Sequence, residues 1–351
     1  MTFNETLSGI YFSSAIPDVP MTIDGPRVLT MISIDGEEIY REHLYPIDKV
    51  VSLADLSELL TPYVRRKLIV EVIISCVDVD VNDKQLDRRG MNFTVAYCAA
   101  ELLKNGEHID PNTFYKEHFL TLLEEKYTMF ECLEYLHYLG TESAVATVTY
   151  MNGTTMDYDM TPVQGNDRYT TIDCSPRNFE HNILGSPIFI DVNAGSRNFR
   201  FSILGSVFSL SLALLFVNSF GVEEMLYCAG AHKVSPDYTR DATYVNGRYK
   251  NYKVTEVRKF SADTGYLSRS MAAWVDELMR SECVRLVTFS DLQPIIGKEI
   301  TITESKTENS NVDNYMPRYT FSYRYAQKNN NIVDYGKAGR IFDQTFDTTF
   351  N

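Results

Sequence analysis

The side chains that could do chemistry in this 351-residue chain are histidines, cysteines and acids, and none of them recurs at a spacing typical of an active site. The histidines are His43, His108, His118, His137, His181 and His232. They form no H-x-H or H-E-x-x-H arrangement, the short spacings that direct two imidazoles at one metal ion. We therefore predict that each histidine is exposed or hydrogen-bonded and that none binds a metal.

The cysteines are scattered in the same way. They are Cys76, Cys98, Cys132, Cys174, Cys228 and Cys283. No C-x-x-C pair is present, so the spacing predicts neither a zinc site nor a disulfide framework. Single cysteines in a long chain usually serve as small hydrophobic side chains, and we expect these to be reduced and mostly buried.

One acidic segment is similar to the start of a calcium-binding loop. In VDVDVND, residues 77–83, Asp78, Asp80 and Asn82 stand where an EF-hand loop has its first ligands. The glycine that such a loop requires is missing, and Arg89 replaces the final glutamate. The pattern favours a strand end with its polar side chains outward, and it leaves open a calcium site completed from elsewhere.

Enzyme motifs are missing from the sequence. There is no G-x-G-x-x-G, no G-x-x-x-x-G-K-[ST] and no G-x-S-x-G. The adjacent acids Glu124-Glu125 and Glu223-Glu224 would point to opposite faces of a strand, so neither pair is expected to form a catalytic dyad. We predict that the chain is not an enzyme and has no catalytic residue and no cofactor.

The composition is that of an acidic, β-rich globular protein. Hydrophobic residues make up 44% and charged residues 23%, and the 23 tyrosines and 19 phenylalanines favour strands. The net charge of -14 gives no attraction for nucleic acid or for an anionic membrane. The opening residues, MTFNETLSGIYFSS, show no export signal, so we expect synthesis in the cytoplasm.

Residues 201–222 are the one stretch long enough to cross a bilayer, because they carry no charge. Large apolar residues from Phe208 to Phe216 alternate with smaller ones that include Ser209 and Ser211, which is the period of a strand. We therefore predict a buried central strand here and no membrane insertion.

Turn dipeptides between alternating apolar runs predict three hairpins. They are centred on Asp35-Gly36 in residues 28–44, on Asn152-Gly153 in residues 144–160 and on Asn246-Gly247 in residues 242–260. A further pair of strands is expected in residues 186–204, around Asn193-Ala194-Gly195. Single strands are expected at residues 67–81 and 318–327, the latter with Tyr319, Phe321, Tyr323 and Tyr325 on one face. Residues 113–140 fit either a helix or, from Glu134 onward, a strand.

Two short helices are expected besides. Ser52 and Asp55 form a capping pattern for a helix that Pro62 would end. The clearer helix covers residues 268–281, where Ser268 can cap and apolar residues recur at 271, 274, 275, 278 and 279.

These elements predict a mostly β protein of two or three sandwich or barrel-like domains with a few short accessory helices. We place an N-terminal β-domain at 1–105 and a second, with a possible helical linker, at 106–205. A third domain, which includes the 268–281 helix, follows at 206–339. Residues 340–351 form a C-terminal arm.

That arm ends in an aromatic series. Phe342, Phe346 and Phe350 recur at intervals of four, which places them on one face of either a helix or a strand. The arm could pack on its own domain as a strap. The sharper hypothesis is that these phenylalanines form a subunit contact, in a groove of a neighbouring chain.

Several segments together resemble a known family. They are YFSSAIPDVPMTIDG, FVNSFGVEEMLYCAG, YVNGRYKNYKV, ADTGYLSRSMAAWVDELMRSECVRL, ITITES, FSYRYAQKNN and GRIFDQTFDTTF, in that order. The chain resembles tail-associated structural proteins encoded by Bacteroides phages and prophages, and its C-terminal half is similar to β-domains of distal-tail and baseplate proteins of long-tailed phages. The resemblance implies a virion tail component that forms a homo-oligomer and binds other tail proteins.

Two alternatives stay open at this point. The chain could be a glycan- or receptor-binding module of the same tail, with a host surface glycan as partner. It could also be a hydrolase of cell-surface polymers, which would require two carboxylates converging in a cleft.

Overall fold

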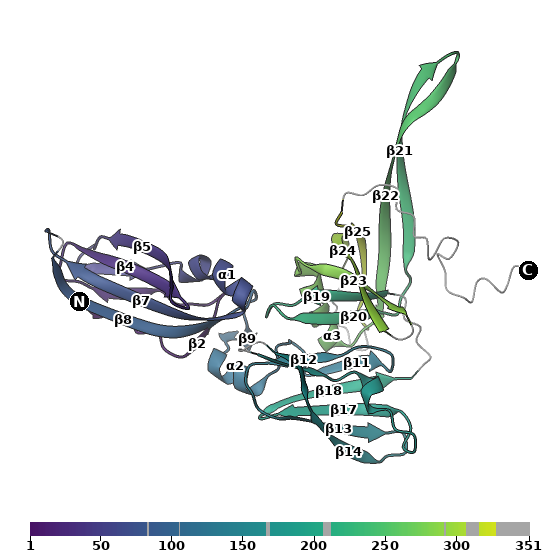
Figure 1. Cartoon of the computed structure of the whole chain (residues 1–351), viewed down its shortest axis with the longest axis horizontal. Helices are drawn as coiled ribbons and strands as arrows, with labels where there is room; N and C mark the ends of the chain where they lie inside the picture. Colours follow the sequence, from purple (N-terminus) through teal and green to yellow (C-terminus); the bar gives the residue numbers. More distant parts are fainter. Residues whose placement is uncertain are drawn as a thin grey trace, which may run out of the picture.

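The chain folds into a mostly β protein, seen in a computed structural model that describes residues 1–82, 84–104, 106–165, 169–205, 212–290, 293–306 and 316–327. The prediction of several sandwich-like β units with a few short helices is confirmed (Figure 1). The C-terminal arm, with Phe342, Phe346 and Phe350, lies outside the described residues.

The first unit is a sandwich of two sheets. Its five-stranded sheet has the order β2 (Ile10–Phe12), β8 (Gln85–Ala96), β7 (Ile69–Val79), β4 (Arg27–Ile34) and β5 (Glu37–Leu44). Its three-stranded sheet has the order β1 (Thr2–Phe3), β3 (Val19–Thr22) and β6 (Val50–Leu53). Both sheets and helix α1 (Leu56–Lys67) contribute to one hydrophobic cluster. In β4 and β7 every second side chain is buried, and these side chains point into that cluster.

The predicted turn at Asp35-Gly36 is confirmed, but the first predicted helix is wrong in its position. Asp35 and Gly36 take φ values of 48° and 86°, as a tight hairpin turn requires. Ser52 belongs to β6 instead of capping a helix, and α1 begins at Leu56 and continues through Pro62. The helix passes the proline because Leu60 and Val64 are buried against the sandwich.

The second unit has a five-stranded and a three-stranded sheet. The larger has the order β11 (Glu125–Met129), β18 (Arg197–Leu204), β17 (Pro187–Ala194), β13 (Ala144–Tyr150) and β14 (Thr155–Met160). The smaller has the order β12 (Tyr135–Tyr138), β16 (Thr170–Asp173) and β15 (Pro162–Gly165). Around these lie the small strands β9 (Leu103–Lys104) and β10 (Glu107–His108), helix α2 (Pro111–Glu117) and the short 3-10 helix η1 (Pro176–Phe179).

The strand pairs predicted at 144–160 and 186–204 are confirmed in this unit. Of the two structures considered for residues 113–140, the strand is the better one, since α2 ends at Glu117 and β12 follows at Tyr135.

The third unit is a seven-stranded sheet covered by one helix. The strand order is β20 (Glu223–Cys228), β19 (Leu212–Val217), β23 (Val284–Ser290), β24 (Gln293–Lys306), β25 (Arg318–Tyr325), β22 (Arg248–Tyr266) and β21 (Lys233–Val245). Helix α3 (Arg269–Arg280) confirms the predicted amphipathic helix, and the Ser268 Oγ accepts a hydrogen bond of 3.2 Å from the amide of Met271. Trp274 and Leu278 of this helix are buried.

The uncharged stretch at 201–222 is a strand where the structure describes it. Residues 206–211 lie outside the described part, and β19 then has buried side chains from Leu212 to Phe216 on both faces. This explains the absence of charge, because a strand covered on both sides has a continuous apolar sequence. In the described part of the chain, every helix is too short or too polar to cross a membrane.

The second and third units share one hydrophobic cluster, which runs from Phe119 through the second unit's sheets to α3 and β25. A buried ion pair lies where the two units meet. The Lys126 ammonium lies 2.6 Å from a Glu134 carboxyl oxygen and donates to the Met225 carbonyl at 2.8 Å. Burial raises the pKa of the Glu134 carboxyl, and the charge of Lys126 opposes that shift.

Candidate functional site

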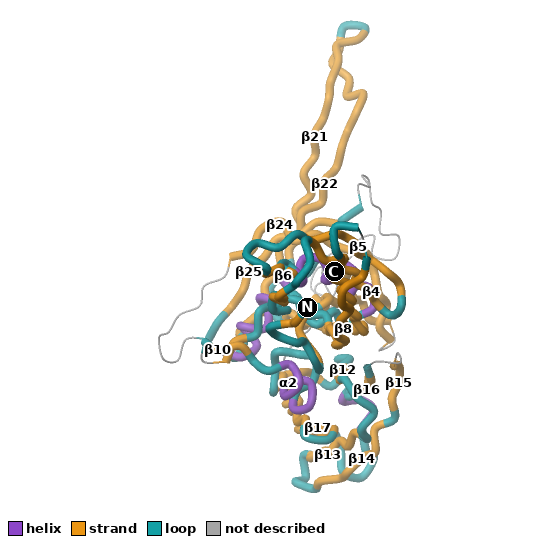
Figure 2. The backbone as a smooth tube through the Cα atoms, turned by 90° about the vertical axis from the view of Figure 1, so that its left-hand side faces the viewer, coloured by secondary structure: helices purple, strands orange, loops and turns teal. Residues whose placement is uncertain are grey.

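A long hairpin projects from the edge of the seven-stranded sheet and is the most prominent surface feature of the molecule (Figures 1 and 2). Strands β21 and β22 pair from Lys233↔Ser261 out to Val245↔Arg248, whereas β22 pairs with β25 only from Phe260 onward. We call residues 235–259 the projecting hairpin. Its strands pair with each other and extend about 30 Å at the usual rise per residue.

The turn at the tip is the one predicted from the sequence. Asn246 and Gly247 take φ values of 51° and 80°, which the short polar side chain and the glycine tolerate. The hairpin is longer than the predicted one, because its first strand begins at Lys233, nine residues before the predicted start, whereas its pairing on the second strand ends at Ser261, close to the predicted end.

The two faces of the projecting hairpin differ in chemistry. One face carries Tyr238, Tyr244 and Tyr249, which are 43%, 62% and 81% exposed. The rings of Tyr244 and Tyr249 meet edge to face, with their centroids 5.1 Å apart. The opposite face carries Lys250 and Lys253, opposite Thr243 and Asp241 in the register. The Arg240 guanidinium lies over the Tyr238 ring, 5.2 Å from its centroid, and tyrosine and arginine are residue types enriched in protein interfaces.

The charge of the hairpin is opposite to that of the whole chain. Residues 235–259 contain six lysines and arginines against three acids, within a chain whose net charge is -14. Residues 105–205, by contrast, contain fourteen acids against six lysines and arginines. A basic projection on an acidic body favours contact with an acidic surface.

An isolated two-stranded hairpin is only marginally stable in water, because it buries little apolar surface. In the projecting hairpin the side chains of Val245, Val254 and Val257 are also 46%, 44% and 39% exposed. A partner that covers these side chains would remove apolar area from water and fix the hairpin. We therefore regard the projecting hairpin as the candidate interaction site.

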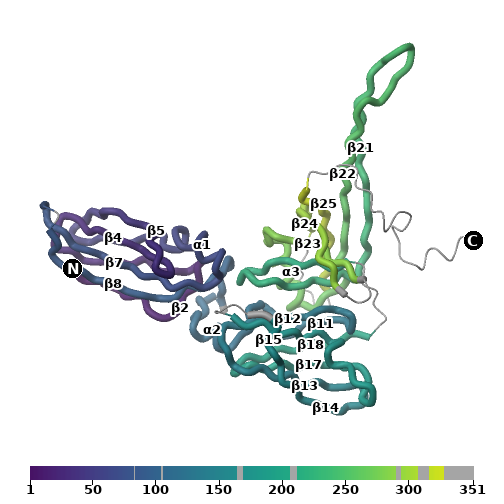
Figure 3. Tube along the Cα trace, in the orientation of Figure 1, coloured from purple at the N-terminus to yellow at the C-terminus, as the bar shows by residue number. Residues whose placement is uncertain are grey.

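The joint between the first unit and the others is a second candidate region (Figure 3). Phe12 of β2, Phe114 of α2 and Phe220 of the β19–β20 turn pack in one cluster there. In the same turn, Gly221 has a φ of 78°, and a β-carbon on it would lie 2.4 Å from the Leu68 side chain of the first unit. The joint is therefore a close packing contact rather than a loose linker.

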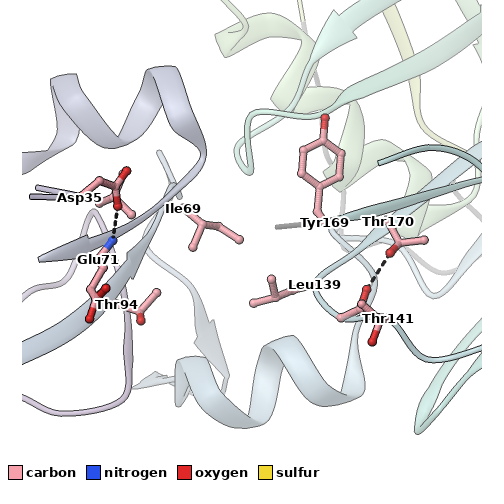
Figure 4. A pocket seen from close by; sticks show the side chains of 10 residues that line it. Asp35, Ile69, Glu71, Thr94, Leu139, Thr141, Tyr169 and Thr170 are labelled. Carbon is pink, nitrogen blue, oxygen red and sulfur yellow. Dashed lines mark hydrogen bonds between the residues drawn. The ribbon is translucent and has the colours of Figure 1, made fainter. Parts of the chain in front are cut away.

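A depression of about 490 Å³ lies on one side of the joint, and Figure 4 shows the side chains that line it. Asp35, Glu71 and Thr94 of the first unit line one side of it, and Tyr169 and Thr170 of the second unit line the other. The Asp35 carboxylate accepts a hydrogen bond of 3.0 Å from the Glu71 amide and pairs with Lys67 at 3.0 Å. Hydroxyls, carboxylates and one tyrosine ring could together bind a polar, ring-shaped ligand.

A smaller cavity of about 380 Å³ lies elsewhere at the joint, and we call it the joint cavity. Its lining includes Arg65 and Tyr97 of the first unit, Ser219 of the β19–β20 turn, and Glu277, Glu282 and Cys283 of the third unit. Arg65 forms a salt bridge with Glu282, and the Ala99 amide donates to the Ser219 carbonyl at 2.8 Å, so both contacts cross the joint.

The structure places the sequence-predicted residues apart from one another. His137 is half-buried and forms hydrogen bonds with the Thr171 hydroxyl and the Glu223 carbonyl, and its removal from water lowers its pKa to about 4, so it is neutral at neutral pH. All six cysteines, which belong to the described residues, are thiols, and five of them are buried as predicted. No group of three or more His, Cys, Asp and Glu side chains in the described part could hold a metal ion.

The prediction that the polar side chains of 77–83 point outward is wrong for Asp78. Its carboxylate is fully buried and accepts hydrogen bonds of 3.0 Å from the amides of Asp24 and Gly25. Two amides in a tight loop need an acceptor, and the end of β7 supplies it. Asp78 is therefore a structural acceptor for the loop before β4.

Glu223 and Glu224 do point in different directions, as expected for neighbours on a strand. Glu223 pairs with Arg285, whereas Glu224 accepts hydrogen bonds from the Trp274 indole at 2.8 Å and the Asn218 amide at 3.0 Å.

Sequence reasoning missed the projecting hairpin as a site, although a signal was present. Residues 235–259 lack the alternation of polar and apolar residues that a half-buried strand shows, and they are basic in an acidic chain.

Comparison of the chain with protein-family models and with curated proteins finds no match.

Proposed function

We propose that the chain is a structural subunit of a phage tail that binds its neighbours through the projecting hairpin. The observation that supports this most is the hairpin itself, which is basic, bears exposed tyrosines and extends beyond the body of an acidic protein. Its neighbours would be further copies of the chain and other tail proteins, as the resemblance of the sequence implies. A virion location follows from the same proposal.

Shortening the hairpin tests the proposal. Replacement of residues 240–254 by Asn-Gly would place a two-residue turn between Thr239 and Thr255, which are paired in the register. We expect the thermal midpoint of the isolated protein to stay within about 2 °C, because the removed side chains contribute nothing to the cores. We expect at least tenfold less of the variant in purified virions, measured by mass spectrometry.

Charge reversal gives a matched control. Lys250→Glu with Lys253→Glu should impair incorporation, whereas Lys84→Glu with Lys116→Glu, the same charge change at exposed sites elsewhere, should not. Equal incorporation of the shortened variant and the unaltered chain would contradict the proposal.

A glycan-binding tail module is the second candidate function, and the depression of Figure 4 favours it. Aromatic rings stack on sugar faces while hydroxyls and carboxylates bind sugar hydroxyls. Tyr169→Ala should then abolish binding on a glycan array, and Tyr63→Ala, at a tyrosine that is 42% exposed, should leave it unchanged. Absence of any glycan signal for the unaltered protein would remove this candidate. Hydrolysis of cell-surface polymers stays an alternative that the sequence left open, beside the prediction that the chain is not an enzyme.

A further inference from the structure

Glu277 of helix α3 is a buried carboxyl group that lacks a hydrogen-bond partner in the part of the chain that the structure describes. Its side chain lines the joint cavity, and the residue is only 2% exposed. Neither carboxyl oxygen forms a hydrogen bond of normal geometry within the described residues. Buried carboxyl groups are normally hydrogen-bonded or paired, so an exception beside a cavity indicates a place for a ligand.

The other acids around the cavity are already engaged. Glu282 is paired with Arg65 across the joint. Glu224, which faces α3 from β20, accepts the hydrogen bond of the Trp274 indole. Glu277 is therefore the acid of the joint cavity that is left for a ligand from outside.

Three further groups face Glu277 without neutralising it. Ser219 lies close enough for its hydroxyl and amide to oppose part of the rise in the pKa of Glu277, although neither forms a hydrogen bond of normal geometry with it. Arg280, one turn further along α3, has a weaker effect in the same direction. The Cys98 thiol of the first unit stays protonated, because burial raises its pKa to about 12.

We infer that the joint cavity binds a small organic cation, an alkylammonium group, through an ion pair with Glu277. The cavity volume of about 380 Å³ accommodates an ammonium group with a chain of several carbons, and ligand sites of this size are usual. Tyr97 and the stems of the lining side chains would contact the alkyl chain. This inference rests on the joint cavity alone and does not depend on the proposed function.

A cation fits these groups better than an anion or a metal ion. An anion would meet the Glu277 carboxylate. Of the two guanidinium groups in the lining, Arg65 is held by Glu282, and Arg280 has its side chain exposed to water. A calcium or magnesium ion requires several oxygen ligands at once, and Glu277 is a single carboxylate. An ammonium group needs one desolvated carboxylate and a few polar contacts.

The same chemistry could come from a free amine or from a lysine side chain of another protein. Two probes separate these sources: n-butylammonium represents the free amine, and N-acetyl-lysine-N-methylamide carries the same group on a peptide unit. n-Butanol has the same chain without the charge and serves as the neutral control.

Trp274 is the reporter for binding, because it is the single tryptophan of the chain and lies one turn before Glu277. Titration of the full chain with n-butylammonium at pH 8 should give a saturable change in tryptophan fluorescence that n-butanol does not give. Glu277→Gln should weaken the apparent affinity at least tenfold, while Asp276→Asn, at the neighbouring acid of α3 that is outside the cavity lining, should change it less than threefold.

A second arm of the experiment needs no variant. Burial raises the pKa of Glu277 to about 7, and binding requires the ionised carboxylate, so the affinity of the unaltered chain should be about tenfold weaker at pH 6 than at pH 8. Equal binding by the Glu277→Gln variant, equal binding of n-butanol, or no saturable change at pH 8 for either amine would each overturn the inference. Binding of the lysine probe alone would assign the site to a protein side chain.

Discussion

Glu134→Gln should lower the free energy of unfolding by about 3–5 kcal/mol, the range measured when one partner of a buried ion pair is removed. The Lys126 ammonium would keep its hydrogen bond to the Met225 carbonyl but would lose its carboxylate contact of 2.6 Å, in a place where its side chain is 7% exposed. The Thr128 hydroxyl, which donates to Glu134 at 2.6 Å, would also face an amide. Urea unfolding at pH 7 measures the loss.

The double variant Lys126→Met with Glu134→Gln is the control for this effect. It removes the unpaired charge and should recover at least half of the lost stability, because most of the expected loss is the desolvation of a lone ammonium rather than the absence of an attraction. A Glu134→Gln variant within about 1 kcal/mol of the unaltered chain would show that the ion pair is not charged in the folded state.

Glu277→Gln should act in the opposite direction and stabilise the protein at pH 8 by about 2–3 kcal/mol. The pKa of Glu277 is about 7 in the folded chain against an ordinary value of 4.5, so the folded state holds the proton more tightly than the unfolded state. The contribution of Glu277 to the free energy of unfolding is fully present below pH 4.5 and is lost as the pH rises through 7. A neutral amide avoids that loss.

The pH dependence separates this explanation from a simple packing effect. The stabilisation should largely disappear near pH 4.5, where the glutamic acid and the glutamine are both neutral in the folded state. Glu282→Gln should instead destabilise slightly above pH 4.5, since Arg65 lowers the pKa of Glu282. Unfolding curves of the unaltered chain, Glu277→Gln and Glu282→Gln at pH 4.5 and pH 8 test this explanation. A stabilisation by Glu277→Gln that is equal at both pH values would contradict the titration of this group.

The features that the sequence predicted well are those that depend on neighbouring residues. Asp35-Gly36 and Asn246-Gly247 are correct turns because positive φ is a local property of these dipeptides. Helix α3 and the inward face of β25, where Tyr319, Phe321 and Tyr323 are buried, follow from periodicity over one element.

The features that were missed depend on distant contacts. The local sequence would allow Ser52 to cap a helix. In the structure, Ser52 of β6 pairs with Pro20 of β3, so the long-range pairing of these strands determines its conformation. The sequence predicted that Asp78 points outward. Its carboxylate instead accepts hydrogen bonds from two amides of the loop at Gly25. Glu277 gave no signal at all, since the first unit meets α3 through contacts that are distant in the sequence.

The course of β22 has a mechanical consequence. This strand runs without interruption from the tip of the projecting hairpin into the sheet, where it pairs with β25 from Phe260 to Tyr266. Hydrogen bonds in an antiparallel ladder lie perpendicular to the strands, so a pull along the hairpin loads them together in shear instead of breaking them one by one. A partner holding the tip can thus transmit tension to the body of the protein without unzipping the sheet.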